Sequence, residues 1–491
     1  PGYSFDMQRE AARASKSMDD RHVTILDVVF LAINARLHSR LLAVNYLNKL
    51  CHQIYCLRKG PNMRILAKDA VNHIGEEITL EGWIHNLREL PEFSFIVLRD
   101  RTGTVQGILE KPDFEVPQIG NEYVIRMKGN CVKSEIAKAG FEIKITGIEV
   151  LSKVVDELPT QINKKNPVEH LDRLLDYRYF SLRHPKLAAV FKVQSCISRG
   201  FREYLSSQEF TEIHTPKIVA SGTEGGANLF KVDYFGRPAY LAQSPQFYKQ
   251  MMVGVFERVF EVAPVFRAEP HNTSRHVNEY TSLDFEMGYI KEENDIMDME
   301  EAVLQYVVGL VNETCQAELE LLGAKVSIPT KIPRMRMTEV HEILEKKYKI
   351  KYPQGFDIDP EGERAICEYV QKEAGSEFVF IDGYPIEARP MYTMPDLEHP
   401  GDTRGFDLIY RGMEITTGGQ RIHGFDMLVD NIRKFKCNPD DFTFYTDVFK
   451  YGMPPHGGLA IGLERITCQM LGLKNIREGT LFPRDLDRLT P

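Results

Sequence analysis

Alternating hydrophobic and polar residues dominate the chain over residues 63–157. Apolar side chains recur there at every second position in short stretches, and Pro, Gly or Asn separates the stretches. A period of two is typical of half-buried β-strands, and several short strands in one region predict a small barrel or sandwich. The stretches are ITLEGWIHNLREL, FSFIVLRDRTGTVQGILE, EYVIRMKGNCVKS and FEIKITGIEVLSK.

The pattern changes after this region. A polar segment with Pro159 and Pro167 predicts a hinge or linker over residues 158–185. Beyond it, AAVFKVQSCISRGFREYLSSQEF carries apolar residues at helical spacing and predicts a long helix. Strands and helices then alternate without a regular strand–helix–strand repeat. This order favours an α+β domain with an antiparallel sheet over residues 186–491.

The first part of the chain, residues 1–62, has a different character. Apolar residues such as Leu37 recur at loosely helical intervals, but charged residues such as Asp27 interrupt them, so no run of membrane-spanning length is present. The segment closes near Gly60, a helix breaker. We predict a dispensable extension of unknown role. An appended helix, a partner-binding element and sequence upstream of a start at Met63 are the alternatives.

Composition narrows the class of protein only slightly. A chain of 491 residues is long enough for two or more domains. Its eight cysteines form no CxxC pair, which argues against a zinc ribbon or a disulfide framework and predicts a cytoplasmic protein. The net charge of −9 gives no global indication of a nucleic-acid partner, although a local basic face could still bind one.

Two common nucleotide-binding patterns are missing from the sequence. There is no GxxxxGK[ST] loop and no GxGxxG after a predicted strand. Any bound nucleotide must therefore be held in another way, and arginines and metal ions are the main alternatives for neutralising a triphosphate.

The strongest chemical signal is the segment Val265–Met287, VFRAEPHNTSRHVNEYTSLDFEM. Its pattern predicts two strands joined by a polar loop, which together present cations, an aromatic ring and carboxylates to one cleft. A solvated hairpin with surface ion pairs explains the same residues equally well. The polar residues are Arg267 and Glu269 on one face of the first strand, Asn272, Arg275 and His276 in the loop, and Tyr280, Asp284 and Glu286 on one face of the second.

A second signal is the segment Gly457–Ile466, GGLAIGLERI. Its glycines precede the Glu464–Arg465 pair within an otherwise apolar strand-to-helix segment. Glycine permits a close approach of the backbone to a ligand, and Arg465 would project a cation from a rigid element. A glycine-rich packing turn followed by a helix-surface arginine is the alternative.

These two segments resemble motifs 2 and 3 of the class II aminoacyl-tRNA synthetases. GFREYLSSQEFTEIHTPKI, which ends near Pro216, resembles motif 1, the homodimer interface of that family. The resemblance covers about residues 63–491, and three motifs in the correct order make chance agreement very improbable. It implies an N-terminal OB-fold β-barrel that binds the anticodon, followed by a class II synthetase catalytic domain built on an antiparallel sheet flanked by helices.

The amino-acid substrate follows from a second resemblance. LAQSPQFYKQ is similar to the corresponding segment of the aspartate-specific members of the family. A side-chain carboxylate needs fixed cations, for which Lys249 and Arg421 are the candidates, and their charges would reject the neutral amide of asparagine. An ordinary exposed lysine is the alternative for Lys249. The residues that the resemblance assigns to L-aspartate are Glu224, Gln246, Lys249, Asp284 and Arg421.

The resemblance also implies ATP as substrate and Mg²⁺ as its metal ion. Arg267 and Arg465 would be the catalytic residues, one on the α-phosphate and the other beside the adenine and γ-phosphate, with Tyr280 stacked on the adenine. Glu414 and Thr417 would hold the metal through hard oxygen ligands. The full set assigned to ATP is Arg267, Glu269, Arg275, His276, Tyr280, Glu414 and Arg465.

The barrel would read the tRNA. Phe95 and Gln106 fall on facing predicted strands, where relatives stack on and hydrogen-bond an anticodon base, and Arg88 would contact a phosphate or a base. A barrel-core position is the alternative for Phe95. The implied partner is tRNA(Asp), and in relaxed members also tRNA(Asn), with residues near His85 and Lys138 as candidates for deciding between them.

Three other functions fit parts of this pattern. The first is a sister synthetase for asparagine or lysine, and the second is a non-catalytic, synthetase-like tRNA-binding protein. The third is a tRNA-independent asparagine synthetase, which would dispense with the barrel. Only a modest insertion fits about residues 291–400, as in the compact archaeal and eukaryotic type of aspartate enzyme.

Overall fold

The computed structural model describes residues 64–110, 114–135, 137, 139–222, 228–353 and 356–491. The predicted extension, the predicted ligand Glu224 and Lys138 lie outside these residues. The chain divides into two compact units, Pro1–Asp156 and Glu157–Pro491.

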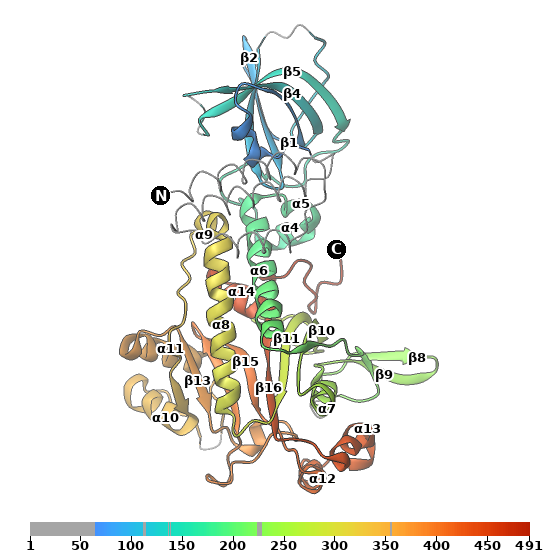
Figure 1. The fold of residues 1–491 in the computed structure, drawn as a ribbon, viewed down its shortest axis with the longest axis vertical. Helices are drawn as coiled ribbons and strands as arrows, with labels where there is room; N and C mark the ends of the chain where they lie inside the picture. The colour runs from blue at the N-terminus through green and yellow to red at the C-terminus, as the bar shows by residue number, and fades with distance from the viewer. Residues whose placement is uncertain (1–63, 111–113, 136, 138, 223–227, 354–355) are drawn as a thin grey trace, which may run out of the picture. The chain divides into compact units, whose positions relative to one another are not determined.

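The first unit is a closed five-stranded barrel with strand order β1-β2-β3-β5-β4 (Figure 1). Strand β1 shows how the barrel is filled: Ile78, Leu80, Gly82 and Ile84 are buried at alternate positions, while the residues between them are half-buried. The barrel alternative of the sequence analysis is therefore confirmed. The elements are η1 (Ala67–His73), β1 (Glu77–Glu89), β2 (Phe93–Asp100), β3 (Gly103–Glu110), β4 (Val124–Lys133) and β5 (Phe141–Ser152).

The second unit is built on an eight-stranded sheet with order β12-β13-β14-β15-β16-β11-β10-β6. The neighbours from β13 to β10 are antiparallel, as predicted, whereas the outer pairs β12–β13 and β6–β10 are parallel. The strands are β6 (Thr211–Glu212), β10 (Arg258–Phe266), β11 (Glu279–Gly288), β12 (Arg334–Arg336), β13 (Phe378–Asp382), β14 (Gly405–Tyr410), β15 (Met413–Gln420) and β16 (His456–Gly462).

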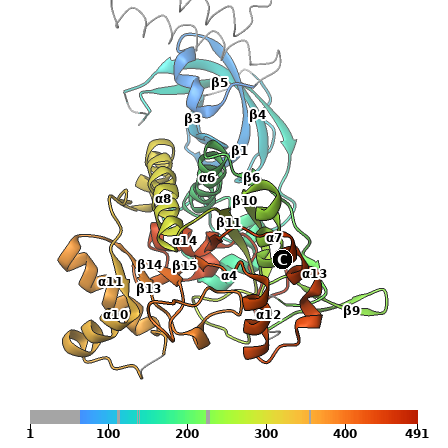
Figure 2. The same cartoon turned by 60° about the horizontal axis from the view of Figure 1, so that its bottom comes forward.

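Two long helices, α6 (Pro185–Ser207) and α8 (Asn294–Thr314), lie side by side on this sheet (Figures 1 and 2). Helix α6 is the long helix that the sequence predicted. It begins where the side chain of His184 accepts the Lys186 amide with Pro185 in the first turn, and it ends before Glu209, whose φ of 64° breaks the helical path. The apolar faces of both helices join the sheet and α14 (Leu463–Leu471) in the main core.

Further helices pack around the other parts of the sheet. Helices α10 and α11 lie beside β13, whereas α12 and α13 form a separate apolar cluster with α7 (Figure 2). Strands β7, β8 and β9 form a small separate sheet. The bounds are α4 (Leu171–Asp176), α5 (Arg178–Ser181), β7 (Ile218–Val219), β8 (Lys231–Tyr234), β9 (Arg237–Leu241), α7 (Gln246–Phe256), α9 (Gln316–Leu322), α10 (Met337–Ile343), η2 (Leu344–Tyr348), α11 (Pro360–Ala374), η3 (Ile386–Ala388), α12 (Phe425–Lys434), η4 (Pro439–Phe442), α13 (Thr443–Thr446), η5 (Asp447–Tyr451) and η6 (Ile476–Gly479).

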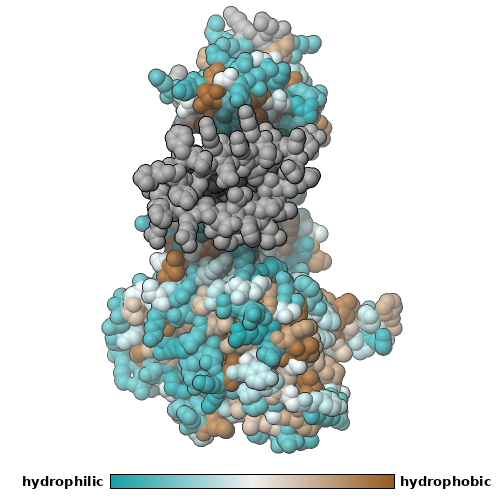
Figure 3. All heavy atoms as spheres, viewed as in Figure 1, coloured by the Kyte–Doolittle hydropathy of each residue, from teal (hydrophilic) through white to brown (hydrophobic). Residues whose placement is uncertain are grey.

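The visible surface of the second unit intersperses hydrophilic and hydrophobic residues and has no continuous apolar belt on that face (Figure 3). Within the described part of the chain, no helix combines the length and the apolar character needed to cross a bilayer.

Candidate active site

A polar pocket opens on the second unit where β11, β15 and β16 lie next to one another. It collects residues that are far apart in the sequence, and all seven residues assigned to ATP line it. The lining also includes Ser282, Ile415 and Glu464, which the sequence analysis did not assign to a ligand. The complete lining is Arg267, Glu269, Arg275, His276, Val277, Tyr280, Ser282, Glu414, Ile415, Thr417, Ala460, Gly462, Glu464, Arg465 and Ile476.

One wall of the pocket is the loop between β10 and β11. The prediction that Arg267 and Glu269 lie within the first strand is wrong, because β10 ends at Phe266. Asn278 shapes the chain beyond it: its carbonyl accepts the Arg267 amide at 2.9 Å, and its side chain donates to the carbonyls of Arg267 and Glu269 at 2.8 and 3.1 Å. Both side chains therefore reach the pocket from an ordered loop.

The loop gathers a cation, a carboxylate and two rings. Glu269 lies 3.9 Å from Nη1 of Arg267 and 3.8 Å from Nε2 of His276. The guanidinium of Arg267 lies 5.9 Å from the ring centre of Tyr280, on β11. Burial lowers the pKa of His276 despite the opposing charge of Glu269, so at neutral pH this ring is a neutral hydrogen-bonding group.

The opposite wall carries Glu414, Thr417 and Arg465. Nη1 of Arg465 lies 3.4 Å from Oε1 of Glu414, and the hydroxyl of Thr417 donates to the same oxygen at 3.1 Å. Burial opposes ionisation of Glu414, but nearby arginines, above all Arg465, outweigh it and lower its pKa. The carboxylate is therefore ionised at neutral pH.

A β-bulge brings Glu414 and Thr417 to the same side of β15. Residues three apart in a regular strand point to opposite faces. Here Ile409 pairs with Glu414 and Leu408 with Thr416, so Ile415 is an additional residue without an opposite partner. The sequence could suggest the pair only through the family resemblance, because nothing in the strand's composition indicates the bulge.

Arg275 is joined to a distant element. Its guanidinium makes an ion pair with Glu363 in the first turn of α11, which belongs to the predicted insertion. Burial raises the pKa of Glu363, although Arg275 opposes the shift.

Next to this pocket lies a fully buried cluster of charged residues. Nζ of Lys249, only 1% exposed, lies 2.9 Å from Asp284 and 3.4 Å from Glu286, so the exposed-lysine alternative is wrong. Nε of Arg421 donates to the other oxygen of Glu286 at 3.0 Å. The hydroxyl of Ser282 in the pocket wall donates to Asp284, which links the cluster to the pocket.

Glu286 holds the two cations of this cluster together. Burial raises the cost of its charge, but Arg421 and Lys249 outweigh that cost and lower its pKa. Behind it, burial lowers the pKa of His456 to about 4, so this histidine is neutral at physiological pH. The predicted ligand Gln246 begins α7 with its amide buried, and its Nε2 has no hydrogen-bond partner among the described residues.

One further buried pair next to Glu414 was not predicted from the sequence. Asp407 on β14 pairs in register with Thr417, and its two oxygens accept from Arg389 at 2.9 and 2.7 Å. The available signal was an aspartate within the apolar stretch FDLIY, since charge in a buried strand is rare without a function or partner.

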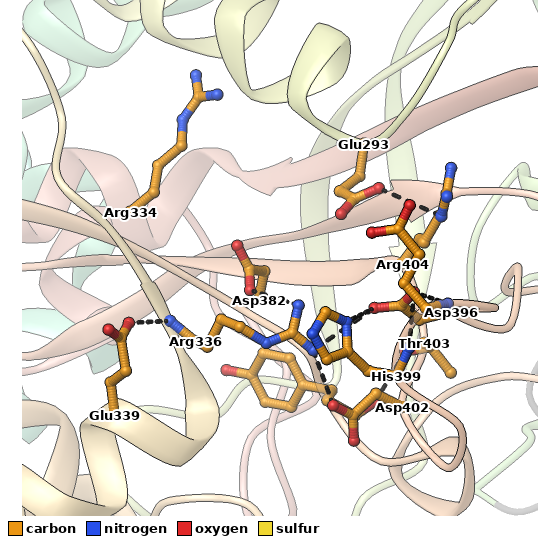
Figure 4. Close-up of polar contacts among 12 residues, drawn as sticks. Glu293, Arg334, Arg336, Glu339, Asp382, Asp396, His399, Asp402, Thr403 and Arg404 are labelled. Carbon is orange, nitrogen blue, oxygen red and sulfur yellow. Dashed lines mark hydrogen bonds and ion pairs between the residues drawn. The ribbon is translucent and has the colours of Figure 1, made fainter.

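Polar contacts hold the chain that leads into β14 (Figure 4). Arg336 lies 2.8 Å from Asp402 and 3.5 Å from Asp396, which fastens the segment before the strand. At the end of this segment, Nη1 of Arg404 donates to the side-chain oxygen of Gln420 at 2.9 Å. Gln420 directly precedes Arg421 in the chain.

The geometry of the OB-fold unit places Phe95 on its outer face. Its neighbour Ile96 is completely buried, whereas Phe95 is half-buried, so the barrel-core alternative is wrong. Phe95 pairs with the exposed Arg88 on β1, and Gln106 on β3 faces the same side. The three predicted residues therefore share one surface.

Gln106 also contacts Glu142 on β5, with 3.3 Å between its Nε2 and the carboxylate. His85, the candidate for tRNA selection, is the additional residue of a bulge in β1 and its Nδ1 lies 2.7 Å from Nη1 of Arg99.

No group of three or more His, Cys, Asp or Glu side chains among the described residues is arranged as a ready-made metal site. This finding is compatible with Mg²⁺, which protein sites usually hold through one or two carboxylates together with substrate phosphates and water. Oxygens of Glu414 and Thr417 lie 3.1 Å apart on the pocket wall and suit such a site.

Comparison with known proteins agrees with this arrangement. Residues 170–486 match the family model described as tRNA synthetases class II (D, K and N), and residues 78–151 match the OB-fold nucleic acid binding domain. The chain therefore belongs to the class II aminoacyl-tRNA synthetases of the aspartate, lysine and asparagine group.

Two curated relatives are similar over nearly their whole length. The chain is 48% identical over 430 residues to the aspartate–tRNA(Asp/Asn) ligase of Thermus thermophilus, a match that covers 87% of this chain and 100% of the relative. It is 44% identical over 425 residues to the aspartate–tRNA(Asp) ligase of Pyrococcus horikoshii, covering 85% and 97%.

Solved structures do not separate the amino-acid specificities. The asparaginyl-tRNA synthetase of Pyrococcus horikoshii, complexed with asparaginyl-adenylate, has a TM-score of 0.81 and 29% identity and covers 87% of this chain and 100% of its own. The aspartyl-tRNA synthetase of Entamoeba histolytica has a TM-score of 0.79 and 30% identity, covering 89% and 94%. Specificity must therefore be argued from the pocket and from the curated relatives.

Proposed function

We propose that this chain activates L-aspartate with ATP and transfers it to tRNA(Asp). The observation that carries the proposal is the buried Lys249–Arg421 pair beside the polar pocket. Two fixed cations held on one carboxylate suit an anionic amino-acid side chain, and both aspartate-specific relatives agree with this choice.

The aspartate side chain would bind to Lys249 and Arg421. Nε of Arg421 and its Nη2 are already oriented by Glu286 and the Gly458 carbonyl, so little reorganisation is needed on binding. The neutral amide of asparagine offers no negative charge to these buried cations, which supports selection for aspartate. Asp284, Gln246 and Glu224 would receive the α-amino end.

ATP would occupy the polar pocket. Tyr280 offers a ring face to the adenine, and Arg267 and Arg465 offer cations to the α- and γ-phosphates. Glu269, Arg275 and the neutral His276 would complete the set by binding the remaining polar groups of the nucleotide.

The reaction implied is an in-line attack. An oxygen of the aspartate α-carboxylate forms a bond to the α-phosphorus, the bond from that phosphorus to the bridging oxygen breaks, and pyrophosphate leaves. The terminal ribose hydroxyl of the tRNA then attacks the aspartyl carbonyl and releases AMP. Arg267 would stabilise the charge that develops on the α-phosphate, and the enzyme contributes positioning and charge rather than a nucleophile.

Glu414 and Thr417 would hold Mg²⁺ on the phosphates. Glu414 is ionised and its oxygen lies beside the Thr417 hydroxyl, so both can serve as hard oxygen ligands. When bound, the ion would neutralise phosphate charge. Removal of Mg²⁺ with EDTA is expected to stop pyrophosphate exchange.

The OB-fold unit would bind the anticodon on the surface that carries Arg88, Phe95 and Gln106. A half-exposed ring with a neighbouring amide and a cation suits an unpaired base and its phosphate. Whether tRNA(Asn) is a second acceptor is decided by the charging experiment below, because relatives that charge one tRNA and relatives that charge both are similar to the chain.

We further propose a cytoplasmic homodimer. The motif 1 region comprises α6 and β6, and β6 is an edge strand of the large sheet, where pairing groups are available. The described cysteines are all free thiols, as in a reducing compartment. Analytical ultracentrifugation tests the dimer, for which a monomer at micromolar concentration is the contrary result.

The deciding experiment charges tRNA(Asp) and tRNA(Asn) transcripts side by side with labelled aspartate, ATP and Mg²⁺. Label on tRNA(Asp) alone indicates a discriminating enzyme, and label on both indicates a relaxed one. Label on neither from folded protein contradicts the proposal and favours a non-catalytic tRNA-binding protein. Arg267→Ala and Arg465→Ala should each lower aspartate-dependent ATP–pyrophosphate exchange by about a hundredfold or more.

A further inference from the structure

The segment 475–488 runs against the loop that carries the proposed ATP ligands. Four hydrogen bonds join the two segments, and three of them lie outside the Arg477 side chain. The Ile476 amide donates to the Ser274 carbonyl at 2.9 Å, the Asn278 amide donates to the Arg484 carbonyl at 2.7 Å, and the Asn272 side chain donates to Asp487 at 2.5 Å. Ile476 itself lines the pocket.

Arg477 is the side chain at the centre of this contact. Its Nη2 donates to the side-chain oxygen of Asn272 in the loop, and its Nε donates to Asp485 in its own segment at 2.5 Å. The Arg477 side chain is 14% exposed and that of Asp485 only 4%, so this ion pair is largely shielded from water. A planar guanidinium that bonds to two partners in fixed directions restrains their relative positions more than a single flexible contact does.

The segment is itself fixed to the body of the second unit. Arg178 on α5, 1% exposed, donates from Nε to the Leu481 carbonyl at 2.9 Å and from Nη2 to the Thr480 carbonyl at 2.8 Å. Gln194 on α6 donates to the Gly479 carbonyl at 2.7 Å. Helices α5 and α6 therefore restrain the segment, and the segment in turn restrains the loop.

The exposed tip of the loop, residues 271–274, depends on polar contacts for its shape. Residues 271–274 are exposed, and they contribute nothing to the apolar cores of the second unit. An exposed loop without apolar packing samples many conformations unless polar contacts restrain it. A nucleotide that binds such a loop must first order it, which weakens the apparent affinity.

We propose that Arg477 is a positioning residue for ATP: through Asn272 it holds the loop that carries Arg267, Arg275 and His276 in its binding conformation. This inference rests on the proposed function of that loop. Arg477 does not line the pocket itself, so its effect would be transmitted through the loop rather than by contact with the nucleotide.

The test is Arg477→Ala in the full chain, assayed by aspartate-dependent ATP–pyrophosphate exchange. The KM for ATP should rise about tenfold, the loss of hydrogen bonds to a charged group, while the KM for aspartate stays within about twofold. The matched control is Arg488→Ala in the same segment, whose partner at 2.8 Å is Asp176 on α4 rather than the loop. It should leave both KM values unchanged.

Two further measurements separate positioning from general stability. Asn272→Ala should raise the KM for ATP similarly, and the double variant should add little to either single change, because both single variants lack the Arg477–Asn272 hydrogen bond. Amide hydrogen exchange of residues 271–276 should be faster in Arg477→Ala and unchanged in Arg488→Ala.

Three results would overturn the inference. They are an unchanged KM for ATP in folded Arg477→Ala, equal rises in both KM values with a lower Tm, and the same effect in Arg488→Ala. Failure of the proposed function has a different signature, since the unaltered chain would then show no aspartate-dependent exchange.

Discussion

At the scale of single residues, two buried glutamates of the second unit show how neighbours decide the charge of a carboxyl. Glu286 lies between Arg421 and Lys249, which lower its pKa in spite of burial. Glu300 on α8 is equally buried, but its polar contact is the hydroxyl of Thr416, and burial raises its pKa to about 8. At neutral pH, Glu286 is therefore an anion and Glu300 a neutral acid.

Glu300→Gln should stabilise the protein at neutral and alkaline pH. The folded-state pKa lies above the ordinary value of 4.5, so Glu300 contributes most stability below pH 4.5 and loses it as pH rises toward about 8. Glutamine keeps the uncharged form and avoids a loss of roughly 3–5 kcal/mol. The Tm of the variant should exceed that of the wild type at pH 8.5.

Thermal unfolding at several pH values checks this expectation. The difference in Tm should shrink as the pH falls from 8.5 to 5.5, because the cost of protonating Glu300 on folding decreases as the pH approaches the ordinary glutamate pKa of 4.5. A difference that is independent of pH would show that Glu300 is ionised in the folded protein.

Arg421→Lys should weaken aspartate binding selectively. Lysine keeps a positive charge near Glu286 but cannot reproduce a planar fork that also contacts the Gly458 carbonyl. The KM for aspartate in pyrophosphate exchange should rise about tenfold to a hundredfold, and the KM for ATP should change little.

The control for this substitution is Arg411→Lys, in the turn between β14 and β15. Arg411 bonds to Glu377 and to carbonyl groups of α14 and does not line the pocket. It should leave the KM for aspartate unchanged. An Arg421→Lys enzyme with a normal KM for aspartate would remove Arg421 from the proposed amino-acid site.

At the scale of elements, regular alternation in one strand and a bulge in another decide which side chains reach a proposed binding surface. Regular alternation on β2 buries Ile96 and leaves Phe95 on the outer face of the barrel. In β15 the opposite applies, since the bulge at Ile415 breaks the alternation and brings Glu414 to the side of Thr417.

Phe95→Ala should impair the charging of tRNA and spare the formation of the adenylate. A base that stacks on the ring would lose about 1–3 kcal/mol, so the KM for tRNA should rise at least severalfold. Pyrophosphate exchange should remain at the level of the wild type, because the residue belongs to the other unit.

Ile148→Ala on β5 is the matched control for this prediction. Ile148 is half-buried like Phe95, but it packs against the barrel core. It should cost at least as much stability and leave the KM for tRNA unchanged. Normal charging by Phe95→Ala would move the anticodon contact away from this face.

At the scale of the whole molecule, the relatives suggest which part of the chain is needed. The Thermus thermophilus relative is matched over its entire length by 87% of this chain. Every residue proposed to bind a ligand lies after residue 63, and all of them except Glu224 are among the described residues. Both observations support a catalytic role for the chain after the predicted extension.

Removal of residues 1–62 should therefore leave kcat and KM for charging within about threefold of the values for the full chain. The measurement is aminoacylation of tRNA(Asp) by both forms at equal active-site concentration. A KM for tRNA that rises tenfold or more on removal would identify the extension as a tRNA-binding element instead.

Local patterns in the sequence determined most of the elements. The period of two between residues 63 and 157 predicted strands, and helical spacing after the linker predicted α6, because each depends on which side of a single element meets the core. The strand-to-helix change within Gly457–Ile466 was likewise predicted from neighbouring residues, and the structure places it at Gly462. The choice of ligands came from the family resemblance and remains a prediction.

Only the tertiary structure decided which charged groups meet. Lys249 and Glu286 come from α7 and β11, and Arg275 meets Glu363 from α11, far away in the sequence. Such pairs depend on how helices and strands pack, and local periodicity carries no information about partners at long range. The sequence alone determined the elements and the family, whereas packing determined the pairing of buried charges, because a charge survives burial only where the fold supplies its partner.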